Sequence, residues 1–405
     1  MIPRAEEGTT FLEPIVREKQ VIVCCGAGGV GKTTTSAALG IAGAMLGRRT
    51  LVLTIDPARR LAEAMGIPAG SREPVTIDPA RFGGATRAPV DAWMLSPSVV
   101  FENLVRRLAP DEERAKVILS SRLYGHLTEV VAGMQEYTAA EALYTLSSSG
   151  KYDLIVLDTP PSRNALAFLE APRKLSMFLD ERVLALFLPG AEKRGFMYGG
   201  AATVVRNVFV KVLGETFWGE LQEFLLRFSG MFDPMRSHAG SVRDLLRSNA
   251  TSFVLVTSPE PAALREAAYF ESRIRDLELP MGGAVLNRSW AYTRGLEHPN
   301  RAHAGMHAAE PALGSDANLA AGHEHAASIP PASVEARALE KMKPLAVAEL
   351  ARADRDRKLL ATLRERQQGK PAIATPHLVG NLDELAGVLS LARHLIYGGD
   401  GRGPQ

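Results

Sequence analysis

The chain has 405 residues, carries a formal net charge of +2 and is 46% hydrophobic. This length allows two domains or one large domain with an insertion, and the nearly balanced charge argues against nucleic acid as a partner. The charged first residues lack the apolar core of a signal peptide, and no run approaches the ~18 apolar residues of a membrane span. We therefore expect a cytoplasmic protein, with peripheral attachment to a membrane as an alternative.

Residues 26–33 form a complete phosphate-loop motif, GxxxxGK[ST], in the context that such a loop requires. The apolar run Val21–Cys25 before it predicts a buried strand, and the proline-free segment 34–46 after it predicts a helix. Glycines let successive backbone N–H groups point at one anion, Lys32 adds a full positive charge, and the Thr33 hydroxyl suits Mg²⁺. The motif therefore predicts binding of a nucleoside triphosphate rather than a chance glycine turn.

Further apolar runs, separated by segments with helical spacing, predict the other strands. We expect them at residues 50–55, 152–157, 252–257, 283–286 and 371–374, with shorter extended pieces near 75–77 and 92–94. Strands that alternate with helices indicate an α/β fold of the P-loop NTPase type, in which a mostly parallel sheet is flanked by helices.

Two long helical stretches, residues 97–149 and 162–248, exceed simple crossovers between strands and predict a helical subdomain inserted in the nucleotide-binding domain. The segment 291–335, rich in Ala, Gly, Pro and His, predicts a flexible excursion. The expected nucleotide-binding domain comprises residues 15–96, 150–161, 249–290 and 336–397.

Two aspartates follow predicted strands and belong at the carboxyl edge of the sheet, beside the phosphate loop. Asp158 comes after four apolar residues, as a Walker B carboxylate does, and Asp56 is placed to order an attacking or magnesium-bound water. Asn287 and Arg288 follow the strand expected at 283–286, and the Asn amide, both donor and acceptor, suits the edge of an adenine base. A purely structural role, such as starting a turn, is the alternative for these residues.

Together these motifs resemble the ArsA-type ATPases, deviant-Walker-A NTPases that include the arsenite-efflux ATPase and the guided-entry ATPase for tail-anchored membrane proteins. The resemblance rests on the phosphate loop 26–34, a first switch at Asp56-Pro57-Ala58, a second switch at Asp158–Leu166, Asn287-Arg288, and a base-closing loop at Pro376-His377-Leu378. The segments Gly133–Glu136 and Thr251–Pro259 are most similar to the bacterial branch of the family.

This resemblance implies ATP and Mg²⁺ as cofactors and a dimer whose conformation follows the nucleotide state. It implies that the phosphates are held by Gly28, Gly29, Val30, Gly31, Lys32, Thr33 and Thr34. The catalytic residues would be Lys32, Asp56 and Asp158, of which Asp56 positions the hydrolytic water. Magnesium would be held, partly through water, by Thr33, Asp56 and Asp158. Adenine would be bordered by Asn287, Arg288 and Pro376.

Ala27 departs from the family pattern, because most members carry there a signature lysine that reaches the partner subunit's phosphates. An arginine finger, which supplies a comparable positive charge, increases the rate of hydrolysis by a factor of ~10³–10⁵. Because Ala27 lacks this charge, we expect slow hydrolysis. The replacement charge comes either from Arg59, Arg60 or Arg163, or from a lysine-bearing paralogue in a heterodimer. The alternative function is a weakly hydrolysing, nucleotide-dependent interaction module.

The second departure concerns metals. The chain has two cysteines, Cys24 and Cys25, which are adjacent and fall in a predicted strand, so we expect core residues and neither a zinc CxxC pair nor an arsenite site. Five histidines lie in the excursion and leave open a metal site or a solvated loop: His298, His303, His307, His323 and His325.

Between residues 204 and 228, apolar residues recur mostly at every fourth position and predict one wide apolar helical face. That face is either the core of the helical subdomain or, as the family resemblance implies, half of a groove for a hydrophobic helix or membrane-protein client.

Overall fold

The computed structural model describes residues 12–55, 60–68, 71–121, 134–160, 170–171, 186–187, 196–291, 334–376 and 385–397. Within these residues one sheet runs in the order β3-β4-β2-β5-β1-β6-β7-β8. Its strands are β1 Val21–Cys25, β2 Thr50–Thr54, β3 Val75–Thr76, β4 Val90–Met94, β5 Leu154–Asp158, β6 Thr251–Thr257, β7 Met281–Ser289 and β8 Ala372–Pro376. All neighbours are parallel except β3 and β4. The predicted α/β fold is confirmed.

Helices pack on both faces of this sheet. The described helices are α1 Glu13–Glu18, α2 Lys32–Met45, α3 Arg60–Met65, α4 Pro97–Leu108, α5 Glu112–Leu119, α7 Met134–Ser148, α10 Phe196–Leu213, α11 Glu215–Phe228, α12 Phe232–Arg247, α13 Pro261–Asp276, α16 Val334–Arg366 and α17 Leu385–Tyr397. The 3-10 turns are Pro79–Phe82 and Ser229–Met231. The helix predicted at residues 34–46 is confirmed as part of α2.

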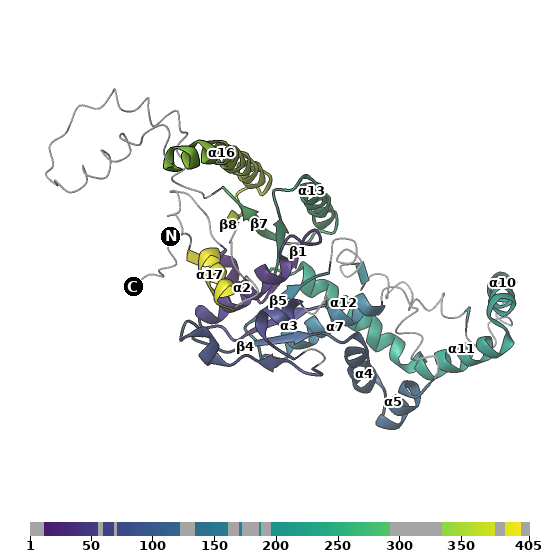
Figure 1. Cartoon of the computed structure of the whole chain (residues 1–405). Coiled ribbons are helices and arrows are strands. Elements are labelled where there is room, and N and C mark those ends of the chain that lie inside the picture. The colour runs from purple at the N-terminus through teal and green to yellow at the C-terminus, as the bar shows by residue number, and fades with distance from the viewer. Residues whose placement is uncertain are drawn as a thin grey trace.

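The strand sequences explain why helices pack on both faces of the sheet. Every residue of β1, β2, β5 and β6 is buried, as expected for parallel strands covered on both faces. In β1, Ile22 and Cys24 join the core under α2 and α17, whereas Val23 and Cys25 join the core under α7, α12 and α13. Figure 1 shows α2 and α17 side by side against the sheet. The central strands, including β1, therefore contribute to two cores.

A third apolar cluster joins α4, α5, α11 and the outer parts of α7 and α12. Phe101, Tyr137 and Met235 are fully or almost fully buried in it. Since α7 and α12 also pack on the sheet, the helical region continues directly from the sheet layer (Figure 1). The domain limits expected from the sequence stay predictions.

Strand β7 corrects one expectation. Asn287 and Arg288 were expected after a strand ending at residue 286, but β7 continues to Ser289. Its pairing with β8 shifts register between Leu286 and Ser289, and Arg288 has a φ of 56°. Such a bulge lets a strand continue past an irregular residue and re-aims the side chains beside it, so both residues lie within the strand.

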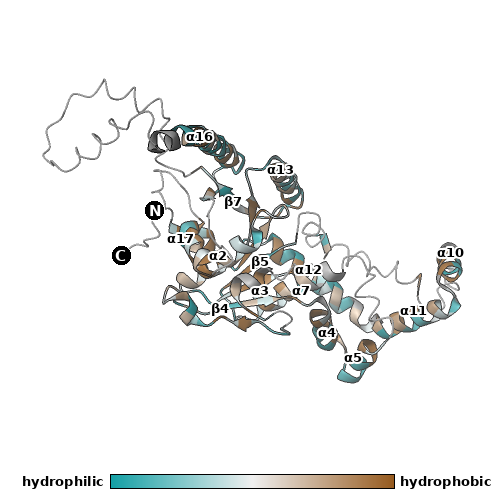
Figure 2. Ribbon diagram, viewed as in Figure 1, coloured by the Kyte–Doolittle hydropathy of each residue, from teal (hydrophilic) through white to brown (hydrophobic). Residues whose placement is uncertain are grey.

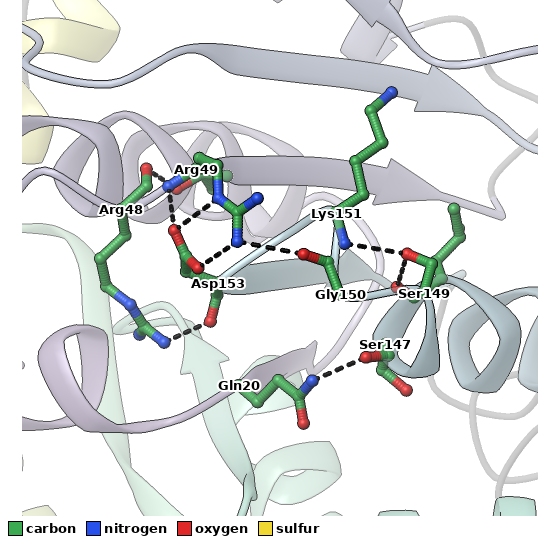
Figure 3. Close-up of polar contacts among 10 residues, drawn as sticks. Gln20, Arg48, Arg49, Ser147, Ser149, Gly150, Lys151 and Asp153 are labelled. Carbon is green, nitrogen blue, oxygen red and sulfur yellow. Dashed lines mark hydrogen bonds and ion pairs between the residues drawn. The ribbon is translucent and has the colours of Figure 1, made fainter.

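A polar network around Arg48 and Arg49 connects the amino-terminal ends of strands at the end of the sheet opposite the phosphate loop (Figure 3). The Arg48 guanidinium donates to the carbonyl oxygens of Val16 and Lys19, each at 2.6 Å, and also to that of Asp153. Arg49 forms an ion pair with the Asp153 carboxylate at 2.7 Å, which lowers the pKa of that carboxyl to about 2. The network joins the end of α1, the turn before β2 and the start of β5.

The burial of His394 makes the stability of the fold depend on pH. It is 4% exposed, its Nε2 lies 2.9 Å from the carbonyl oxygen of Ala374, and burial lowers its pKa. The folded state therefore favours the neutral imidazole. The free energy of unfolding is not reduced by this histidine above the pKa of an unfolded histidine, ~6.5, and it decreases as the pH falls below that value.

We expect the melting temperature to fall more steeply between pH 7.5 and pH 5.5 in the wild type than in His394→Gln. The limiting slope for one such group is ~1.4 kcal/mol per pH unit. Parallel melting curves across this range would contradict the assignment.

Candidate functional site

The phosphate loop is shaped by its closeness to strand β6. Gly26 follows β1, and a Cβ built there would lie 2.0 Å from the carbonyl oxygen of Val256. Gly29 and Gly31 have φ values of 77° and 92°, which residues with a side chain rarely adopt. The path of the loop thus depends on glycine at these three positions.

Helix α2 begins directly after Gly31, so its amino end faces the loop. Lys32 stands in its first turn, is 7% exposed, and its Nζ donates to the carbonyl oxygen of Ala27 at 2.7 Å. The helix amino terminus and a buried ammonium together attract anions. Gly28 and Gly29 are exposed beside it, and Thr34 is half-buried in the same turn.

Thr33 and Asp158 meet across the carboxyl ends of β1 and β5. The Thr33 hydroxyl donates to Oδ2 of Asp158 at 2.7 Å, and the Thr54 hydroxyl donates to the same oxygen at 3.1 Å. Asp158 is 1% exposed at the end of β5. A hydroxyl and a carboxylate side by side are hard oxygen donors, so this pair fits Mg²⁺ by the chemistry of its ligands.

Asn287 approaches the loop from strand β7. Its Nδ2 donates to the carbonyl oxygen of Val30 at 2.7 Å, and its Oδ1 accepts a hydrogen bond of 2.6 Å from Thr375 on β8. Arg288 beside it is exposed, and Pro376 is half-buried and in register with Ser289. The structure therefore gathers Lys32, Thr33, Asp158 and Asn287 around one loop.

Sequence reasoning missed Thr375 at this edge and gave no role of its own to Thr159, which it placed in the second switch. Thr159 donates from its hydroxyl to the carbonyl oxygen of Cys24 at 2.8 Å. Both threonines lie where a buried strand ends, and that position is the one signal that could have indicated them. The expectation of core cysteines is confirmed: Cys24 and Cys25 are 0% and 1% exposed, and burial raises the pKa of both thiols.

Several expected functional residues lie outside the described residues. They are Asp56 to Arg59, the second switch beyond Pro160, the loop after Pro376, Gly133, and the five histidines of the excursion. Arg60 begins α3, but its side chain is also outside the described part. Their roles stay predictions.

Ala27 occupies the position discussed above for the signature lysine. Its residue is 5% exposed and belongs to the apolar core under α2. The side chain supplies no charge, while its carbonyl oxygen holds Lys32.

The apolar stretch 204–228 is divided between two helices that meet at Gly214, which has a φ of 89°. On α11, residues such as Phe224 and Phe228 are buried in the helical cluster. On α10, three valines at four-residue spacing are 63%, 54% and 73% exposed: Val204, Val208 and Val212. In Figure 2 the hydrophobic colour extends onto α10, which lies away from the sheet. Among the described side chains of this stretch, the exposed large apolar ones are therefore the three valines of α10 and Leu226 of α11, whereas Phe209 packs on Phe187 and Trp218.

Comparison with known proteins agrees with this geometry. Residues 19–293 match the ArsA family, described as anion-transporting ATPase. The chain belongs to this family.

Individual ArsA-family relatives are distant. The chain is 24% identical to a putative arsenical pump-driving ATPase of Aquifex aeolicus, over 61% of this chain and 58% of the relative. It is 28% identical to the ATPase GET3 of Malassezia globosa, over 50% and 59% of the two chains. With the ATPase ARSA2 of Chlamydomonas reinhardtii it shares 28% identity over 68% and 70%. The match thus spans less than two thirds of the first two relatives.

The short distance between Gly26 and the Val256 carbonyl oxygen predicts how a methyl group at residue 26 changes nucleotide binding. We expect Gly26→Ala to weaken binding of MgATP at least tenfold, because the loop must move away from Val256 to admit the side chain. Isothermal titration measures the affinity.

Gly214→Ala is the matched control, since Gly214 also has a positive φ but no neighbouring atom within 4 Å of a Cβ. It should carry the backbone strain without changing the affinity. Equal affinities of the two variants would contradict the account of the loop.

Proposed function

We propose that this chain is a Mg²⁺-dependent ATPase that converts ATP to ADP and phosphate and acts as a dimer whose conformation follows the nucleotide state. The observation that carries the proposal is the meeting of Lys32, Thr33 and Asp158 at a glycine-bent loop on one edge of the sheet. Membership of an ATPase family supports it.

Each residue then has a distinct task. Backbone N–H groups of residues 28–34 and the Lys32 ammonium bind the phosphates, with Lys32 exchanging the Ala27 carbonyl for a phosphate oxygen. Thr33 and Asp158 hold Mg²⁺, which when bound neutralises charge on the phosphates. Asp56 orients the attacking water, and Asn287, Arg288 and Pro376 border the base.

Hydrolysis by this site is slow in our proposal because Ala27 supplies no cation across the dimer. Arg59, Arg60 or Arg163 provides that charge, or a lysine-bearing paralogue completes a heterodimer. The same buried alanine also favours the second candidate function, a nucleotide-dependent interaction module that hardly turns over.

A hydrophobic helix or a membrane protein is the client that we propose. The exposed valines of α10 support it, because apolar side chains at helical spacing leave an unpartnered stripe on the described surface. None of the helices among the described residues combines the length and apolar character needed to cross a bilayer. The proposed location is the cytoplasm, with peripheral contact to a membrane.

Steady-state phosphate release separates the two candidate functions. We expect slow turnover by the wild type, no turnover above background by Lys32→Ala, and at least tenfold faster turnover by Ala27→Lys, which restores the missing cation. Because residue 27 is buried, Ala27→Met is the control for a long uncharged side chain and should not increase the rate.

Binding of ATP without turnover by either the wild type or Ala27→Lys would instead favour the interaction module. Phosphate release above background that is equal in the wild type and Lys32→Ala would contradict catalysis at this loop, and a wild type that binds no ATP would contradict both functions.

A further inference from the structure

A chain of two hydrogen bonds connects strand β8 to the phosphate loop. The Thr375 hydroxyl donates to Oδ1 of Asn287 at 2.6 Å, and Nδ2 of Asn287 donates to the carbonyl oxygen of Val30 at 2.7 Å. Thr375 is 0% exposed and Asn287 is 6% exposed. Water therefore does not compete for these bonds, and each loss leaves a buried polar atom without its partner.

The second bond fixes a peptide group of the loop. Val30 precedes Gly31, the αL residue that begins α2. In a planar trans peptide the C=O and the following N–H point in opposite directions. Holding the Val30 carbonyl against Asn287 thus sets the direction of the Gly31 N–H, one of the loop donors. The amide also lies close to the loop, since a Cβ at Gly31 would be 2.1 Å from Nδ2.

The first bond decides which way the amide faces. A carbonyl accepts hydrogen bonds and cannot donate, so Val30 requires the NH₂ end of Asn287. Thr375 holds the oxygen end on the opposite side. In the wild type, rotating the amide so that its oxygen faces the Val30 carbonyl breaks the hydrogen bond from Thr375. Without the Thr375 hydroxyl, the rotation no longer costs that bond.

We propose that Thr375, acting through Asn287, is a positioning residue for the phosphate loop, and that the Asn287 amide holds this loop through the Val30 carbonyl. Thr375 directly precedes Pro376, the residue expected beside adenine, so one strand end positions both the base side and the phosphate side. The inference rests on the proposed function, because it concerns nucleotide binding by this loop.

The test uses the full chain with Thr375→Val, which removes the hydroxyl at nearly constant volume, and Thr375→Ser, which retains it. Thr251→Val is the matched control: Thr251 is also 0% exposed on a strand, but its hydroxyl donates at 2.7 Å to the carbonyl oxygen of Leu245, remote from the loop. Affinities for MgATP, MgGTP and magnesium tripolyphosphate are measured by titration, and hydrogen exchange of residues 26–33 is measured without nucleotide.

We expect Thr375→Val to weaken ATP and tripolyphosphate alike, by about tenfold, the size expected for one lost buried hydrogen bond. The ratio of ATP to GTP affinity stays constant and exchange in the loop becomes faster. Thr375→Ser recovers most of the affinity, and Thr251→Val lowers the melting temperature without changing binding.

Unchanged tripolyphosphate affinity in Thr375→Val, or a changed ATP to GTP ratio, would overturn the proposal, because Thr375 would then act on the base and not on the phosphate loop. If the wild type binds none of the three ligands, the proposed function fails. The positioning role is tested independently of ligand binding by hydrogen exchange: unchanged exchange of residues 26–33 in Thr375→Val would refute it.

Discussion

The phosphate loop passes so close to strand β6 that its backbone leaves no space for a side chain at Gly26. This contact fixes where the chain leaves β1, and the left-handed glycines that follow direct it into α2. The site depends on this path, because Lys32 and Thr33 occupy their places only if the helix begins there. Asp158 and Asn287 reach the same loop from β5 and β7, which flank β1 and β6 in the sheet.

The parallel sheet supplies the rest of the arrangement. Its strands bring residues more than 100 positions apart, such as Thr33 and Asp158, to one edge. At the other edge the Arg48 and Arg49 network ties the strand starts together, so that the two ends of the sheet serve separate purposes. In open α/β sheets ligands bind beyond the carboxyl ends of the strands, and the candidate site lies at that edge of this sheet.

Much of this fold could be predicted from the sequence, since a strand buried on both faces must be a short apolar run and the phosphate loop has its own glycine pattern. The bulge at Asn287 could not, because it depends on how β7 pairs with β8. Thr375 was missed for a related reason: a threonine in an apolar strand has no distinctive pattern until its partner is known. Which apolar side chains of residues 204–228 are exposed and which are buried likewise depends on tertiary packing.

The central claim is that this loop holds the polyphosphate of ATP. A crystal structure with Mg²⁺ and a non-hydrolysable ATP analogue tests it most directly. The account predicts Lys32 Nζ within hydrogen-bond distance of a phosphate oxygen instead of the Ala27 carbonyl, and loop N–H groups directed at the same phosphates. A nucleotide bound elsewhere, with Lys32 still on Ala27, would contradict it.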